Sequence, residues 1–98
     1  MTVAQGKPRP AVIIQSSVVA TPGSLIICPL TSFLIEAPIY RPTILPTPAN
    51  GLKMPSQLMV DRITFAREER IANVIGSLDA DDLERLDLTL VILLDLGG

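Results

Sequence analysis

Two side chains in this sequence have the chemistry and the spacing to bind one phosphodiester. Arg9 stands between two prolines, and residues 11–14 follow it as an apolar, largely β-branched run typical of a buried strand. Each proline fixes its own φ and keeps the preceding residue extended, so Arg9 lies on a stiff approach to that strand. Thr31 ends a second apolar run. If the two strands pair antiparallel, the guanidinium and the hydroxyl reach the same sheet edge and could hold one phosphate.

The residues alone leave a plainer interpretation open. An arginine at the start of a strand is commonly a solvated edge charge, and a threonine after a strand is commonly a turn residue. Other catalytic chemistries find less support. The chain has no histidine, which excludes Ser-His-Asp and Cys-His arrangements. We expect the single cysteine, Cys28, to pack as a buried thiol, and we predict no metal site, no cofactor and no glycine-rich phosphate loop.

Length and composition indicate one small domain, residues 1–98. The chain is 48% hydrophobic but only 3% aromatic, so its core must be aliphatic, and a chain this short and apolar is expected to oligomerise. One cysteine and no signal peptide predict a reducing cytoplasm. No apolar run approaches the roughly 20 residues that span a bilayer, so we expect no membrane association.

Charge is divided unevenly along the chain. Residues 1–78 carry seven Lys and Arg against four Asp and Glu, a net charge of +3. Residues 79–98 carry one arginine against six acids, a net charge of -5, which gives -2 for the chain. The overall acidity argues against tight nonspecific binding of nucleic acid, but the asymmetry permits a local basic face. A solvated charge distribution without function is equally open.

Hydrophobic patterns predict a mainly β fold with a C-terminal helix (α+β). We expect about five antiparallel strands, at residues 11–17, 24–30, 43–45, 57–63 and 71–77. Residues 1–6 look like an arm or loop edge, and residues 67–70 like one charged turn. A helix is predicted over 79–96, capped by Asp79, with leucines at helical spacing. Strands without intervening helices imply a strongly bent sheet or small barrel. The wide apolar stripe of the helix fits either contact with another subunit or burial in its own core.

Four blocks carry a family resemblance, namely KPRPAVIIQSS, LIICPLTS, GLKMPSQLMVDRI and GSLDADDLERLD. In this order and at this spacing the chain resembles the MazF/PemK family of toxin endoribonucleases. The resemblance implies a small SH3-like barrel of the CcdB/MazF type, usually a homodimer, neutralised by a cognate antitoxin whose disordered segment folds along the toxin surface.

The resemblance also implies a reaction. It is metal-independent, sequence-selective cleavage of single-stranded RNA, in which the 2′-hydroxyl attacks the adjacent phosphate. The catalytic arginine of the family falls on Arg9, and its threonine falls on Thr31. The residues predicted to bind RNA are Lys7, Gln15, Ser16, Ser32 and Arg62.

The sequence departs from the family in two places. Family members begin with a further strand and an acidic loop before the arginine motif; this chain starts where that loop should end, which predicts a missing strand and an unpaired sheet edge. Arg62 replaces the usual glutamine, and Thr64 stands where an arginine is common. Two alternatives therefore remain open. One is a protein-binding module like the CcdB-type toxins, which bind a topoisomerase. The other is a remnant that folds only with a partner.

Overall fold

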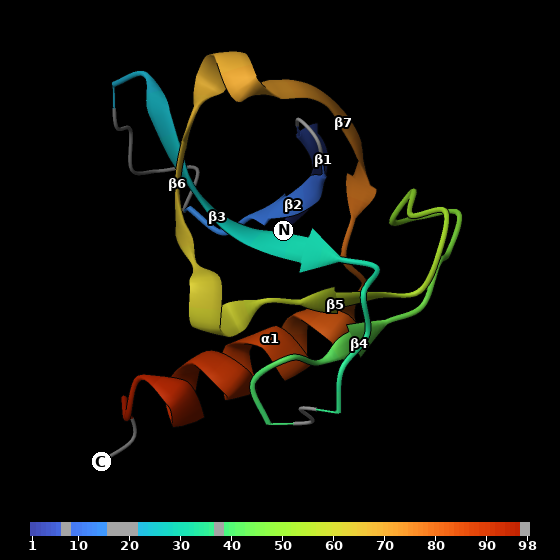
Figure 1. Cartoon of the computed structure of the whole chain (residues 1–98), viewed down its shortest axis with the longest axis vertical. Helices are drawn as coiled ribbons and strands as arrows, with labels where there is room; N and C mark the ends of the chain where they lie inside the picture. The colour runs from blue at the N-terminus through green and yellow to red at the C-terminus, as the bar shows by residue number, and fades with distance from the viewer. Residues whose placement is uncertain (7–8, 16–21, 37–38, 97–98) are drawn as a thin grey trace.

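The computed structural model of the chain describes residues 1–6, 9–15, 22–36 and 39–96. Within these residues seven strands form a curled antiparallel sheet in the order β4-β5-β3-β2-β1-β7, with β6 paired to β3. Figure 1 shows β6, η2 and β7 arching round β1, β2 and β3, while α1 crosses beside β4 and β5. The bounds are β1 Thr2–Gly6, β2 Pro10–Ile13, β3 Ser24–Thr31, β4 Thr43–Ile44, β5 Ser56–Leu58, η1 Val60–Arg62, β6 Thr64–Arg67, η2 Glu68–Arg70, β7 Ile71–Ser77 and α1 Ala80–Leu93.

The sheet is organised around β3, its longest strand. The first half of β3 pairs with β6, its middle pairs with β2, and its last two residues pair with β5. The continuous apolar run of β3 suits a strand with partners on both edges, because no charged side chain has to be buried. The predicted bent sheet and the predicted edge position of β4 are both confirmed.

The core lies on one face of this sheet. Val3, Val12 and Cys28 stand opposite one another across β1, β2 and β3, and all three are fully buried. Their neighbours along each strand alternate to the other face, as the two-residue period of a strand requires. Leu86 of α1 and Leu58 of β5 complete the same core. The core is aliphatic, as the composition predicts.

Helix α1 begins as the sequence predicts. The Asp79 carboxylate accepts the Asp82 N–H at 2.8 Å, so it satisfies one of the free amides of the first turn. The Arg85 guanidinium donates to the Thr43 carbonyl at 2.7 Å and fastens the helix to β4. The helix ends at Leu93, earlier than predicted, and Asp95 follows with a φ of 54°. Within the described residues, the helix is too short and too polar to cross a bilayer.

The outer face of α1 is apolar and open. Leu88, Ile92 and Leu94 are each more than half exposed, whereas Leu86 and Thr89 are buried. The helix is therefore not sunk in its own core, which was one of the two interpretations of its wide stripe.

Two expectations about the N-terminal segment are wrong. Residues 1–6 are not an arm, because Thr2–Gly6 forms β1 between β2 and β7. The predicted unpaired edge at this place is therefore filled. Only Val3 and Ala4 of this segment are buried, so its short apolar pattern gave little signal for a strand.

Three further elements differ from the prediction. The strand predicted over 57–63 spans Ser56–Leu58 and is followed by η1, where the Arg62 N–H donates back to the Met59 carbonyl at 2.9 Å. Strand β6 then follows, where no strand was predicted, which makes seven strands instead of five. Strand β2 ends at Ile13 instead of reaching residue 17, and residues 16–17 lie outside the described part of the chain.

Gly51 fixes the loop between β4 and β5 against β7. It has a φ of 70°, and a Cβ at this position would overlap the Ile75 carbonyl. Gly23 has nearly the same φ, 72°, but a Cβ there would meet open space. A side chain would cause backbone strain at both glycines, but it would overlap neighbouring atoms only at Gly51.

We expect Gly51→Ala to lower the free energy of unfolding by about 3 kcal/mol or more, because strain and overlap add. Gly23→Ala, the matched control, should lose only about 1–2 kcal/mol from strain. Urea denaturation of both variants measures the difference. Equal losses would show that the loop moves aside without penalty.

Candidate active site

Arg9 and Thr31 line one pocket. Ala11 stands opposite Pro29 in the β2–β3 ladder, and continuing this register by two residues sets Arg9 opposite Thr31. Both residues border the same pocket of about 550 Å³, at the end of the two strands. The antiparallel pairing predicted from the sequence therefore brings the two candidate catalytic residues together.

The backbone of Arg9 is held by the last residue of β1. The Gly6 N–H donates to the Arg9 carbonyl at 2.9 Å. A Cβ on Gly6 would come within 2.6 Å of that carbonyl oxygen, so only glycine permits this close approach. The Arg9 side chain is exposed at the pocket and supplies a fixed positive charge with a planar set of donors.

Thr31 is buried, and its hydroxyl is oriented. Its exposed fraction is 5%, and its Oγ1 accepts the Phe33 N–H at 3.1 Å. A hydroxyl that accepts one hydrogen bond keeps its own proton to donate. The Thr31 O–H can therefore be directed at an anionic oxygen held in the pocket.

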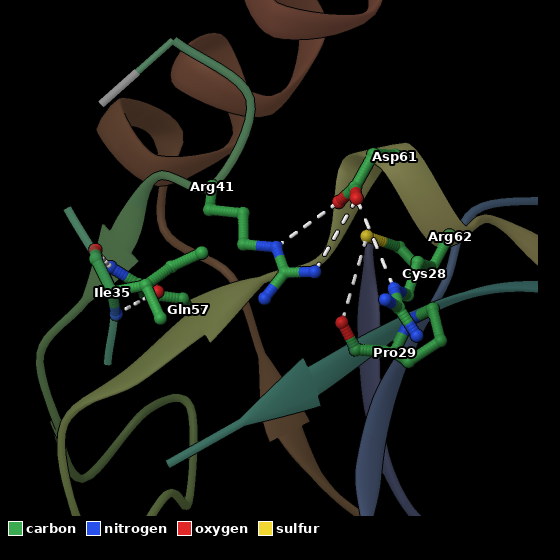
Figure 2. A network of polar contacts seen from close by, with 7 residues as sticks. All are labelled: Cys28, Pro29, Ile35, Arg41, Gln57, Asp61 and Arg62. Carbon is green, nitrogen blue, oxygen red and sulfur yellow. Dashed lines mark hydrogen bonds and ion pairs between the residues drawn. The ribbon is translucent and has the colours of Figure 1, made fainter. Parts of the chain in front are cut away.

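A buried amide fixes the loop that follows Thr31. Gln57 lies opposite Thr31 in β5 and is only 4% exposed. Its Oε1 accepts the Ile35 N–H at 3.1 Å, and its Nε2 donates to the Ile35 carbonyl at 2.8 Å, as Figure 2 shows. The Nε2 also donates to the Thr43 hydroxyl at 3.3 Å. The loop is thus tied to two strands by one side chain.

Sequence reasoning missed several residues of this pocket. Ser32 was predicted and borders the pocket beside Thr31. Among the lining residues that were not predicted, four carry polar or aromatic side chains from four separate segments: Gln5, Phe33, Lys53 and Asn73. Their separation in the chain hides them, although a lone lysine after an Asn-Gly turn is a signal that could have marked one of them.

Two other residues predicted to bind RNA, Gln15 and Arg62, lie outside this pocket. Gln15 follows the opposite end of β2 from Arg9, and its Oε1 accepts the Ile26 N–H at 3.1 Å. Arg62 lies on η1, and its side chain is 68% exposed. Neither residue lines the pocket. Lys7 and Ser16 lie outside the described residues.

Asp61 forms an ion-paired cluster on η1 (Figure 2). The Arg41 guanidinium donates to both of its carboxylate oxygens, at 3.2 and 3.3 Å, and Arg62 lies 3.9 Å away. The hydrogen bond from Arg41 lowers the pKa of Asp61 below its ordinary value of 3.8. This cluster fastens the segment before β4 to η1 and lies apart from the Arg9 pocket.

Burial controls the chemistry of Cys28. Loss of solvent around the thiol raises its pKa to about 12, and the negative charge of Asp61 adds to this effect. The thiol donates weakly to the Pro29 carbonyl at 3.9 Å (Figure 2). Such a thiol is a packing residue, as predicted, because the reactive thiolate hardly forms.

A second hollow lies beside the first. It has a volume of about 400 Å³ and is mainly apolar, and it shares Arg9 and Pro10 with the polar pocket. The space is open because small side chains line this face of the sheet, opposite the core: Ala4, Ala11 and Ala66.

Comparisons with known proteins agree with this architecture. The sequence profile of the family described as PemK-like, MazF-like toxin of type II toxin-antitoxin system matches residues 3–94. The probable endoribonuclease MazF of Mycolicibacterium smegmatis is 37% identical over 93 residues, which cover 95% of this chain and 85% of that protein.

Two solved structures share the fold. The Mycobacterium tuberculosis toxin MazF-mt6 superposes with a TM-score of 0.78 at 22% identity, covering 96% of this chain and 94% of that one. A second structure, of an Mtb toxin, gives a TM-score of 0.77 at 20% identity, covering 90% of this chain and 94% of the other. At these identities the likeness concerns the fold alone.

We expect the Cys28 thiol to resist modification in the folded protein. At pH 8 its reaction with Ellman's reagent should be more than about 100-fold slower in buffer than in denaturing urea, because the folded thiol stays protonated and covered. Absorbance at the released thiolate measures both rates. Comparable rates would mean that the thiol is accessible and ionised.

We expect the Asp61 cluster to stabilise the fold only above acidic pH. Folding lowers the pKa of Asp61, so the ionised carboxylate adds to the free energy of unfolding. This contribution is complete above a pH of about 4, the unfolded pKa, and is lost as the pH falls through the lower pKa of the folded state. Asp61→Asn should therefore be less stable than the wild type at pH 7, with the difference shrinking toward pH 3. Denaturant titrations at both pH values measure it; a constant difference would contradict this account.

Proposed function

The chain belongs to the PemK-like, MazF-like toxins of type II toxin-antitoxin systems, and we propose that it is an endoribonuclease that cleaves single-stranded RNA. The observation that carries the proposal is the shared pocket of Arg9 and Thr31. The 37% identical relative, a probable endoribonuclease, supports the same activity.

In the proposed reaction the 2′-oxygen of one nucleotide attacks the adjacent phosphorus. The O2′–P bond forms, the P–O5′ bond breaks, and the 2′ proton is lost while the leaving 5′-oxygen gains one. The products are a 2′,3′-cyclic phosphate and a free 5′-hydroxyl. Arg9 stabilises the charge that grows on the phosphoryl oxygens and takes part in proton transfer. Thr31 donates its O–H to a non-bridging oxygen, held in position by its bond from Phe33.

We propose that the reaction needs no metal ion and is selective for sequence. Arg9 and Lys53, both on the pocket, supply the positive charge that a divalent cation would otherwise bring to the phosphate. The amide side chains of Gln5 and Asn73 border the same pocket, where they could distinguish the edges of bases. Lys7, Gln15, Ser16, Ser32 and Arg62 are proposed as further RNA contacts.

The proposed partners are a second copy of this chain and a cognate antitoxin, in a reducing cytoplasm. The exposed apolar face of α1, with Leu88 60% and Ile92 56% exposed, supports association with another chain. The same face favours a second candidate function. In that alternative the chain is a non-catalytic, CcdB-type binding module whose helix contacts a topoisomerase.

We expect Arg9→Ala to reduce cleavage of single-stranded RNA by roughly 100-fold or more, since a preorganised donor to the transition state is lost. Thr31→Val should also reduce the rate, and Thr31→Ser should retain part of it. Arg67→Ala, an exposed arginine on β6 outside both pockets, is the matched control.

The assay uses a mixed single-stranded RNA with EDTA present and maps the product ends. Cyclic phosphate and 5′-hydroxyl ends support the proposed chemistry. Equal rates for Arg9→Ala and wild type would remove Arg9 from the mechanism. No cleavage by the folded wild type at high enzyme excess would favour the binding module.

A further inference from the structure

We propose that Phe33 and Lys53 form a nucleotide subsite beside the scissile phosphate. In this subsite the Phe33 ring stacks on the adjacent base, and the Lys53 ammonium binds the next phosphate of the same strand. The inference rests on the proposed function, because it assumes that Arg9 and Thr31 hold a phosphodiester of RNA. It adds the residues that take the neighbouring nucleotide.

Phe33 is an unusually exposed aromatic residue. Its side chain is 77% exposed, the largest fraction among the large apolar side chains of the described residues. A single exposed apolar residue needs no explanation by itself. This one, however, lines the same pocket as Arg9 and Thr31. An aromatic face beside a phosphate site is the arrangement that single-stranded nucleic acid uses for stacking.

The backbone that carries Phe33 is held on both sides. The Phe33 N–H donates to the Thr31 hydroxyl oxygen. Two residues further along the chain, Ile35 forms hydrogen bonds to the Gln57 side chain through both its N–H and its carbonyl. These bonds place the ring at a fixed distance along the chain from the candidate catalytic hydroxyl. Because the backbone is already held, base stacking has to order only the side-chain torsions of Phe33.

Lys53 is supplied by a second loop that is also internally fixed. Asn50, which is 1% exposed, accepts the N–H groups of Thr47 and Leu52 at 3.0 Å and donates to the Leu45 carbonyl at 2.9 Å. Lys53 follows directly and is exposed. It pairs with no carboxylate among the described residues.

The charges around the pocket favour an anionic ligand. Arg9 and Lys53 are its two cations, and no carboxylate is among the described residues that line it. Two cations and one aromatic side chain on a single pocket suit two successive phosphates and one base of a single strand. The hydroxyl of the exposed Ser32, which borders the same pocket, adds a donor for the ribose or phosphate.

The first test uses a tryptophan reporter, because the chain has no tryptophan of its own. The probe is a pool of single-stranded 12-nucleotide RNAs of random sequence, 2′-O-methylated throughout so that they cannot be cut. We expect this pool to quench the fluorescence of Phe33→Trp, since the indole stacks on a base. Phe65→Trp is the matched control, because Phe65 is 69% exposed on β6 and lines neither pocket.

The same pool measures affinity by fluorescence anisotropy. Phe33→Ala should raise Kd by roughly 5- to 150-fold, the loss of one stacked base, while Phe33→Trp and Phe65→Ala should bind like the wild type. Lys53→Gln should lower the slope of log K against log salt by about 0.7, the value for one phosphate contact on a single strand. Arg67→Gln, another exposed cation, should leave the slope unchanged.

The outcomes separate this inference from the proposed function. If the wild type cuts unmodified RNA while Phe33→Ala and Lys53→Gln bind the methylated pool normally, the subsite is wrong and the nuclease stands. If the two variants lose binding as expected but the wild type cuts nothing, the subsite stands and the nuclease is wrong. If the wild type fails to bind the pool even at low salt, the subsite is overturned.

Discussion

The pairing register of β2 with β3 is the constraint on which the candidate site depends. Ala11 opposite Pro29 leads, two residues on, to Arg9 opposite Thr31. A slip of one residue would turn alternate side chains to the other face and bury the wrong set. The aliphatic core fixes the register, because Val12 and Cys28 must both face it. The register that buries Val12 and Cys28 therefore also sets Arg9 opposite Thr31.

The sequence predicted the parts of this arrangement that rest on long apolar runs or on capping chemistry. Strands β3 and β7 and the helix that starts after Asp79 were found for this reason, and so was the meeting of Arg9 with Thr31. The family likeness, carried by four ordered motifs, is confirmed by the profile match over residues 3–94. Strand β1 was missed because its burial depends on neighbours that are distant in the sequence.

The rest of the site could not be predicted from hydrophobic periodicity, because buried side-chain amides hold its loops in place. Gln57 and Asn50 look like ordinary polar residues in the sequence, yet both are almost completely buried and hold loop backbone in place. Their cost of burial is offset because each makes several hydrogen bonds. The loops they hold bring Phe33 and Lys53 to one pocket from positions twenty residues apart in the chain. The Asn-Gly turn before Lys53 could mark that residue as a loop cation, but nothing in the local sequence indicates that it meets Phe33.

The pairing of β1 with β7 has a consequence for synthesis. Thr2 stands opposite Ser77, so the first strand finds one of its two neighbours only after most of the polypeptide has left the ribosome. Contacts between residues so far apart form late in folding. Strand β1 therefore lacks this neighbour until residues 71–77 have been made, and the sheet that carries the Arg9 pocket is completed late.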